Sequence, residues 1–116
     1  MIRVKRAYDP PEPTDGRRFL VDRLWPRGVT KEELAIDGWI KDVSPSDALR
    51  RWYGHSPNRW PEFWRRYRGE LDGNPEAWQP LLAAASEGDV TLIYAAKDME
   101  RNNAIVLRDY LLERSQ

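Results

Sequence analysis

The sequence predicts an α/β protein: one small domain with a mostly parallel sheet of about three strands, covered by about five helices. Three segments have the composition of strands, near residues 2–7, 18–23 and 90–96. Segments with apolar residues at helical spacing lie between the second and third strands and after the third. This order of strand, strand, several helices, strand and helix is typical of the α/β class.

The three strand segments differ in pattern. Residues 2–7 alternate between apolar and charged side chains, and the proline-rich segment 9–16 ends this strand. Residues 18–23 contain adjacent apolar side chains, as expected of a strand covered on both faces. Residues 90–96 are rich in β-branched and aromatic side chains, which predicts the clearest strand of the chain.

Capping residues delimit the first helices. Thr30 with Glu33 has the pattern of a capping box, which predicts the start of a short helix. The apolar residues of segment 36–43 follow at helical spacing, so this segment is also expected to be helical. Ser46 is expected to cap a further short helix that ends at Gly54.

Three longer helices are expected after this point. Ser56 with the following proline predicts a helix start, and an apolar stripe from Trp60 to Leu71 predicts its buried face. Asn74 and a proline open the next helix, which Gly88 ends. Asp98 is expected to cap the last helix.

The composition limits the classes of function. A chain of 116 residues is expected to form a single domain over 1–116. The absence of cysteine excludes disulfides, Cys-based metal centres and thiol nucleophiles, and His55 is the only imidazole. No membrane span, signal peptide or cofactor-binding motif is present, so we expect a cytoplasmic protein without membrane association, and neither a cofactor nor a metal is predicted.

The zero net charge conceals a gradient along the chain. Residues 1–68 contain fifteen Lys or Arg and ten Asp or Glu, whereas residues 69–116 contain four and nine. The overall balance argues against a protein that coats nucleic acid. The arginine-rich first part is open to two interpretations: solvated helix faces with a coding bias, or an arginine-lined anion site.

The segment Asp22-Arg-Leu-Trp-Pro-Arg-Gly28 is the most unusual of the chain. It follows the second strand, and its proline and Gly28 predict a preorganised loop that approaches a ligand closely. Arg23 and Arg27 have the chemistry of a clamp for phosphate or carboxylate. In the alternative interpretation Asp22 pairs with a neighbouring arginine, Trp25 packs, and the segment is an internal Asp–Arg network that stabilises the fold.

A second group of polar residues follows the third strand. Because parallel strands bring their carboxyl ends to one edge of a sheet, we expect this group to meet the first. Asp22, Asp98 and Lys97 are therefore candidate catalytic residues, with either aspartate as base or ligand of a hard metal. The candidate ligand-binding residues are Arg23, Trp25, Arg27, Gly28, Asn102 and Asn103. The alternative is that Asp98 only caps a helix and Lys97 is solvated.

A rival hypothesis uses the arginine-rich helical surface. Nucleic acid or a protein partner would bind to Arg50, Arg51, Arg59, Arg65, Arg66 and Arg68. The aromatic stripe between them is expected in the core, and no recognition-helix pattern is present, so nucleic acid is disfavoured without being ruled out. His55 has no evident Ser or Asp partner, which favours a surface role over a role as base.

Several strings resemble one family. Residues 20–28, 49–55 and 90–98, with Asn102-Asn103, closely resemble the short YeaO-like branch of the domain-of-unknown-function 488 family. The resemblance covers essentially the whole chain and implies a cytoplasmic bacterial or archaeal protein without an established activity. Longer relatives carry Cys-His where this chain has Asn102-Asn103, so Cys- or His-based chemistry does not transfer. The resemblance also implies that 9–16 is a shortened helix, now a loop, and that the first two strands are parallel.

The best hypothesis from the sequence is a pocket for a small anionic ligand, phosphate- or nucleotide-like, at the carboxyl edge of the sheet. Arg23 and Arg27 would hold the anion, with Lys97 assisting. The sequence does not decide whether the protein is an enzyme, which ligand it binds, what its oligomeric state is or what its physiological role is.

Overall fold

A four-stranded, fully parallel sheet forms the centre of the protein, as seen in a computed structural model that describes residues 1–115. The strands are β1 (Ile2–Arg6), β2 (Arg17–Leu20), β3 (Gly38–Trp39) and β4 (Val90–Tyr94), in the spatial order β1-β4-β2-β3. The α/β class and the parallel first and second strands are confirmed. The sheet has one strand more than expected.

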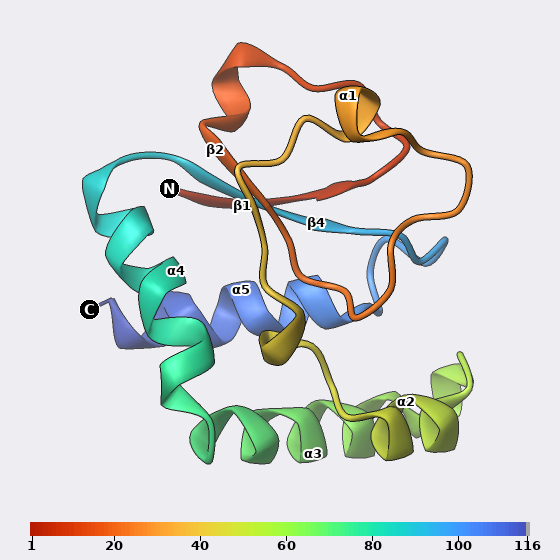
Figure 1. The fold of residues 1–116 in the computed structure, drawn as a ribbon. Coiled ribbons are helices and arrows are strands. Elements are labelled where there is room, and N and C mark those ends of the chain that lie inside the picture. Colours follow the sequence, from red (N-terminus) through yellow and green to blue (C-terminus); the bar gives the residue numbers. More distant parts are fainter. Residues whose placement is uncertain (116) are drawn as a thin grey trace.

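Five α-helices accompany the sheet: α1 (Lys31–Leu34), α2 (Asp47–Tyr53), α3 (Trp60–Asp72), α4 (Pro75–Glu87) and α5 (Asn103–Arg114). Helices α2 to α5 lie on one side of the sheet, with α5 between the sheet and α3 (Figure 1). Helix α1 and the segment between β1 and β2 lie on the other side. Within residues 1–115 no helix combines the length and apolar character needed to cross a membrane.

The strands bury different side chains on their two faces. Alternate strand residues face the helices and form the larger core with them; these are Ile2, Phe19, Val90, Leu92 and Tyr94, with Val21 just after β2. On the opposite face Leu20 and Ile93 pack with Ala7 and Leu34 in a smaller core. Because both faces are covered, the end of β2 and the next residue are adjacent apolar side chains, Phe19, Leu20 and Val21, in agreement with the sequence pattern.

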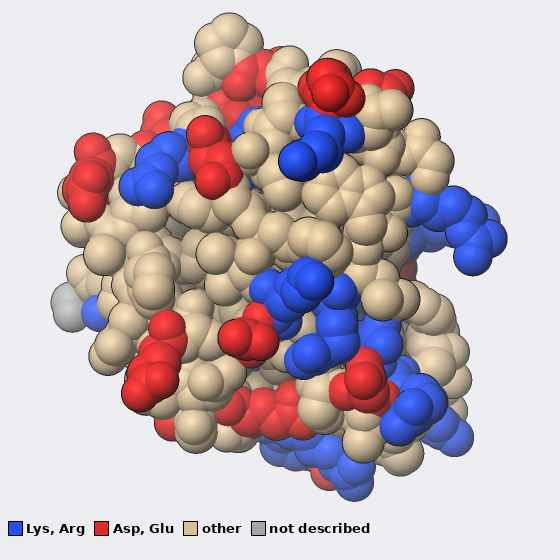
Figure 2. Space-filling view, viewed as in Figure 1, with Lys and Arg blue, Asp and Glu red and all other residues tan. Residues whose placement is uncertain are grey.

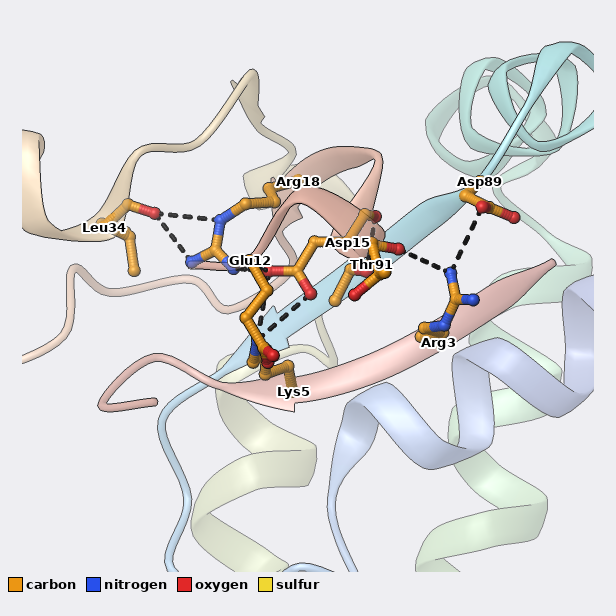
Figure 3. A network of polar contacts seen from close by, with 9 residues as sticks. Arg3, Lys5, Glu12, Asp15, Arg18, Leu34, Asp89 and Thr91 are labelled. Atoms are coloured by element: carbon orange, nitrogen blue, oxygen red, sulfur yellow. Dashed lines mark hydrogen bonds and ion pairs between the residues drawn. The ribbon is translucent and has the colours of Figure 1, made fainter. Parts of the chain in front are cut away.

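A buried polar network completes the cover of the second face (Figure 3). Asp15 and Arg18 are each 4% exposed, and Arg18 Nη1 donates to Asp15 Oδ2 at 2.6 Å. Lys5 Nζ lies 3.1 Å from Asp15 Oδ1. Nε and Nη2 of Arg18 donate to the carbonyl oxygen of Leu34, and the Thr91 hydroxyl donates to the carbonyl oxygen of Asp15. The network therefore joins β1, β2, β4 and α1 around one carboxylate.

The expectation of a helix over segment 36–43 is wrong. The chain forms β3 and then a 3₁₀ turn there. Ala35 adopts a left-handed conformation with φ 50°, which ends α1. The N–H of Ile40 then donates to the carbonyl oxygen of Leu20, so the chain runs beside β2. Hydrogen bonding to the edge of β2 therefore favours an extended conformation here, although the four apolar residues of the segment are spaced as in a helix.

The capping residues predicted for the two short helices are confirmed, whereas the one predicted for the last helix is wrong. Thr30 and Glu33 form the expected capping box, and the Ser46 side chain caps α2. Asp98 does not cap α5, because that helix begins five residues later at Asn103. The side chain of Asn102 accepts from the N–H of Ile105 and is the cap.

Asp15→Asn is expected to destabilise the protein by about 3–5 kcal/mol at neutral pH, because it leaves buried cations without their carboxylate. Burial alone would raise the pKa of Asp15, but the N–H of Glu12 and the cations of Lys5 and Arg18 outweigh it and lower the pKa. The folded state therefore binds the carboxyl proton less readily than the unfolded state. Chemical denaturation of both proteins across pH measures the difference.

The loss of unfolding free energy in Asp15→Asn should be complete above the ordinary Asp pKa of about 3.9. It should shrink as the pH falls through the lowered pKa that Asp15 has in the folded state. Glu12→Gln is the control, because the Glu12 side chain is 60% exposed and its pair with Lys5 contributes about 1 kcal/mol or less. Equal losses for the two variants would contradict the structural role assigned to Asp15.

Candidate functional site

A cleft of about 920 Å³ lies at the carboxyl edge of the sheet. Its walls come from the loop after β2, from α2 and from the loop between β4 and α5. Six Lys or Arg side chains line it, against two carboxylates; they are Arg23, Arg27, Arg50, Arg51, Lys97 and Arg101, with Asp22 and Asp98. Lys and Arg side chains gather over the loop after β2 and over the helices below it, with acidic side chains among them (Figure 2).

Eight of the nine residues singled out from the sequence line this cleft, and Gly28 does not. Gly28 has φ 77°, in the left-handed region that favours glycine, so its place in the motif is explained by the turn that it forms. The parallel order of β4 and β2 brings the other residues together, because both strands end at the same edge. Their roles in binding stay predictions.

Asp22 is the half-buried carboxylate of the cleft. Its Oδ2 accepts from the N–H of Ala95 at 2.9 Å, so it joins the end of β2 to the end of β4. Burial raises the pKa of Asp22, and the Ala95 N–H, the side chain of Asn103 and the charge of Arg50 only partly oppose this effect. No hydrogen bond to Oδ1 is recorded within residues 1–115. Asp22 thus has few donors for a carboxylate in a cleft that is otherwise rich in N–H groups.

Arg23 and Arg50 share a single carboxylate. Arg23 Nε lies 3.6 Å from Asp47 Oδ1, and Arg50 Nη2 lies 2.8 Å from the same oxygen. The Nε atoms of both arginines are buried and have no hydrogen-bond partner among the described residues. Two guanidinium groups therefore face the cleft with one counter-charge between them.

Asp98 organises its own loop. Its Oδ1 accepts from the N–H groups of Glu100 and Arg101, both at 2.9 Å. These hydrogen bonds, and then the charges of Arg101 and His55, lower the pKa of Asp98. A carboxylate held in this way is a poor proton acceptor. Lys97 beside it is exposed and forms no recorded ion pair within residues 1–115.

The two asparagines are occupied by backbone groups. Asn102 is buried, and its amide accepts from the N–H of Ile105 and donates to the carbonyl oxygen of Asp98. Asn103 Nδ2 donates to the carbonyl oxygen of Val21 at 3.1 Å. These amides hold the loop after β4 against the end of β2, so they shape the cleft.

Trp25 and Arg27 have different environments in the motif. Trp25 Nε1 donates to the carbonyl oxygen of Val29, and its ring packs edge-on against Trp39 with centroids 5.4 Å apart. Arg27 is exposed, and its carbonyl oxygen accepts from the hydroxyl of Tyr8. The charged residues of the motif form no ion pair with one another within residues 1–115, which argues against the internal Asp–Arg network.

Sequence reasoning did not assign Arg50, Arg51 or Arg101 to this site. Arg50 and Arg51 were placed on the rival helical surface, and helix α2 brings them to the cleft. Arg101 carried no motif signal. His55 also lines the cleft; it is exposed, with φ 57° and its ring 6.3 Å from that of Tyr53. Within residues 1–115 no group of three or more His, Cys, Asp or Glu side chains could hold a metal ion.

The remaining arginines of the rival surface are engaged by local contacts. Arg65 and Arg66 both pair with Glu62, and Arg68 pairs with Glu113 at 2.7 Å. The guanidinium of Arg59 lies over the ring of Trp52, 5.4 Å from its centroid.

Fold and site define a small α/β protein with an arginine-lined cleft at the carboxyl edge of a parallel sheet. The chain belongs to the family whose model is described as "Inactive DUF488-N3 subclade", which matches residues 1–116. This confirms the resemblance to the domain-of-unknown-function 488 family.

Relatives of the same length are found in distant bacteria. The chain is 42% identical over 110 residues to the uncharacterized protein YeaO of Escherichia coli (strain K12), covering 95% of this chain and 96% of that protein. It is 41% identical over 110 residues to the uncharacterized protein Rv3073c of Mycobacterium tuberculosis (strain H37Rv), covering 95% and 92%. No solved structure matches the chain.

Asp22→Asn is expected to leave the protein folded and to raise its stability at neutral pH by about 0.5–2 kcal/mol, as when a strained site residue is replaced. The asparagine can still accept from Ala95, and the half-buried charge is removed. Because the pKa of Asp22 is raised in the folded state, its charge destabilises that state above the ordinary Asp pKa. The gain should therefore disappear as the pH falls below about 3.9.

Thermal and denaturant unfolding across pH measure this gain, with Asp15→Asn as the contrasting variant. A loss of several kcal/mol in Asp22→Asn would instead assign Asp22 to an internal network that stabilises the fold.

Proposed function

We propose that the cleft binds a small anion with a phosphate-like group, and that the protein acts by binding this ligand. The observation that carries the proposal is the surplus of cations: six Lys or Arg side chains line the cleft, against two carboxylates. Both carboxylates already accept backbone N–H groups. The lining therefore carries four more cations than carboxylates, and Asp47 outside the lining, which pairs with Arg23 and Arg50, offsets one of them.

Arg23 and Arg50 are the best candidates for direct contact. A buried N–H without an acceptor costs about 1–3 kcal/mol, and each of these arginines has a buried Nε in that state. Phosphate oxygens match the planar fork of a guanidinium and can accept two parallel hydrogen bonds from it. A bound phosphate group would therefore satisfy groups that the protein itself leaves without acceptors.

Binding is better supported than catalysis. Asp98 has a lowered pKa and is a poor base, so of the three candidate catalytic residues Asp22 and Lys97 are retained as ligand contacts. The family model that matches the chain is described as an inactive subclade, which also favours binding. Nucleic-acid binding through Arg59, Arg65, Arg66 and Arg68 has weaker support because acidic or aromatic neighbours engage each of them.

Arg50→Ala is expected to lower the affinity for phosphate-containing ligands by about 10- to 100-fold, since it removes charge-assisted hydrogen bonds. Inorganic phosphate, pyrophosphate and a nucleoside monophosphate are titrated in a phosphate-free buffer. A ligand at a hundredfold excess over its Kd should raise the Tm of the unsubstituted protein by about 10 °C.

Arg65→Ala is a closely matched control. Arg65, like Arg50, is a helical arginine paired with an acidic residue three positions earlier, but it lies outside the cleft. Its substitution should leave binding unchanged. If none of the three anions stabilises the unsubstituted protein, or if both variants respond equally, the cleft is not an anion site. Binding of DNA with a steep salt dependence would then favour the rival surface.

A further inference from the structure

We infer that the ligand is a phosphate ester of a sugar, and that Asp22 selects it by accepting a hydrogen bond from a sugar hydroxyl. This inference rests on the proposed anion binding and adds the chemical class of the ligand. Sugar phosphates and nucleotides share this chemistry. It is carried by three features of the cleft: its size, the Asp22 carboxylate with no hydrogen bond recorded to Oδ1 within residues 1–115, and its apolar wall.

The cleft is larger than an inorganic anion requires. Its volume of about 920 Å³ lies at the upper end of the range of roughly 300–1,000 Å³ for sites that hold organic ligands. Phosphate alone would fill a small part of it. The size of the site therefore indicates an anionic group attached to a carbon skeleton.

Asp22 restricts the chemistry of that skeleton. An ionised carboxylate only accepts hydrogen bonds, and Oδ2 is already used by Ala95. The other oxygen would repel a ligand that carries only negative charge and acceptors. A donor on the ligand, either a hydroxyl or an amine, would give this oxygen a hydrogen bond. An ammonium group is disfavoured because six cationic side chains line the same cleft. A neutral hydroxyl satisfies both constraints.

The wall beside these groups is apolar. Tyr53 and Phe63 line the cleft, are 7% and 3% exposed, and have ring centroids 4.6 Å apart. Pro45 lies in the same lining and is buried. The carbon face of a sugar, or the base of a nucleotide, can pack against such a surface while its hydroxyls and phosphate reach the polar side.

Calorimetric titration of the full chain tests the inference with five probes: inorganic phosphate, phenyl phosphate, ribose, ribose 5-phosphate and adenosine monophosphate. Ribose 5-phosphate or adenosine monophosphate is expected to bind about 10- to 100-fold more tightly than inorganic phosphate and phenyl phosphate, the value of one charge-assisted hydrogen bond. Ribose alone should bind much more weakly. Tighter binding of adenosine monophosphate would assign the site to nucleotides, and equal binding would assign it to sugar phosphates.

In Asp22→Asn the preference for the sugar esters should fall to about threefold or less, while inorganic phosphate binds as well as before or more tightly, because a negative charge is gone. Asp42→Asn, an exposed aspartate outside the cleft lining, should keep the full preference. The ligand comparison in the unsubstituted protein tests the hydroxyl requirement even if Asp22→Asn fails to fold.

The outcomes separate the two proposals. Equal binding of all four phosphate compounds, unchanged in Asp22→Asn, would overturn the role of Asp22 and the sugar ester while anion binding stands. Absence of binding by every probe would overturn both. A preference for phenyl phosphate over ribose 5-phosphate would show that the apolar wall selects the ligand and would overturn the hydroxyl requirement.

Discussion

The buried ion pair between Asp15 and Arg18 covers a part of the sheet that no long helix reaches. A parallel sheet needs cover on both faces, and here the connection from β1 to β2 is a short proline-rich segment. The pair is satisfied on every side, by Lys5, by the carbonyl oxygen of Leu34 and by the N–H of Glu12. It holds the first residues of β2 in place, and the course of β2 sets where Asp22 and Arg23 emerge at the opposite edge.

Two aspartates at opposite ends of β2 show how the same side chain stabilises a fold in one place and marks a candidate site in another. Asp15 is surrounded by cations and N–H groups, and its pKa is lowered. Asp22 is half-buried, its donors are the neutral N–H of Ala95 and the amide of Asn103, and burial raises its pKa. Proteins tolerate such incompletely satisfied groups mainly at functional sites, where a ligand supplies the missing partner.

The residues at the sheet edge of the candidate site could be predicted from the sequence. Their positions depend only on which segments form strands and on the parallel order of those strands. Asp22, Arg23, Lys97 and Asp98 lie in the short loops that follow β2 and β4, and parallel strands end at one edge. The arginines of α2 could not be placed in this way. Arg50 reaches the cleft because α2 packs beside α3, more than 20 residues after the motif, and it meets Arg23 at Asp47. The pattern of residues 46–54 predicts a helix, but it does not predict which other element packs against each face of that helix.

The sequence by itself determined the α/β class, the order of the elements, most helix ends and the family, because capping residues, strand composition and the motif at 22–28 act through near neighbours in the chain. Only the tertiary structure decided that residues 38–39 form an edge strand beside β2, that Asn102 and not Asp98 caps α5, and that arginines from three segments face one cleft. The edge strand and the gathering of the arginines depend on hydrogen bonds or packing between segments far apart in sequence, whereas the Asn102 cap is a local contact with the N–H of Ile105. Contacts between distant segments can outweigh the conformational preference of a short stretch of sequence, because a buried backbone or charged group needs a hydrogen-bond partner.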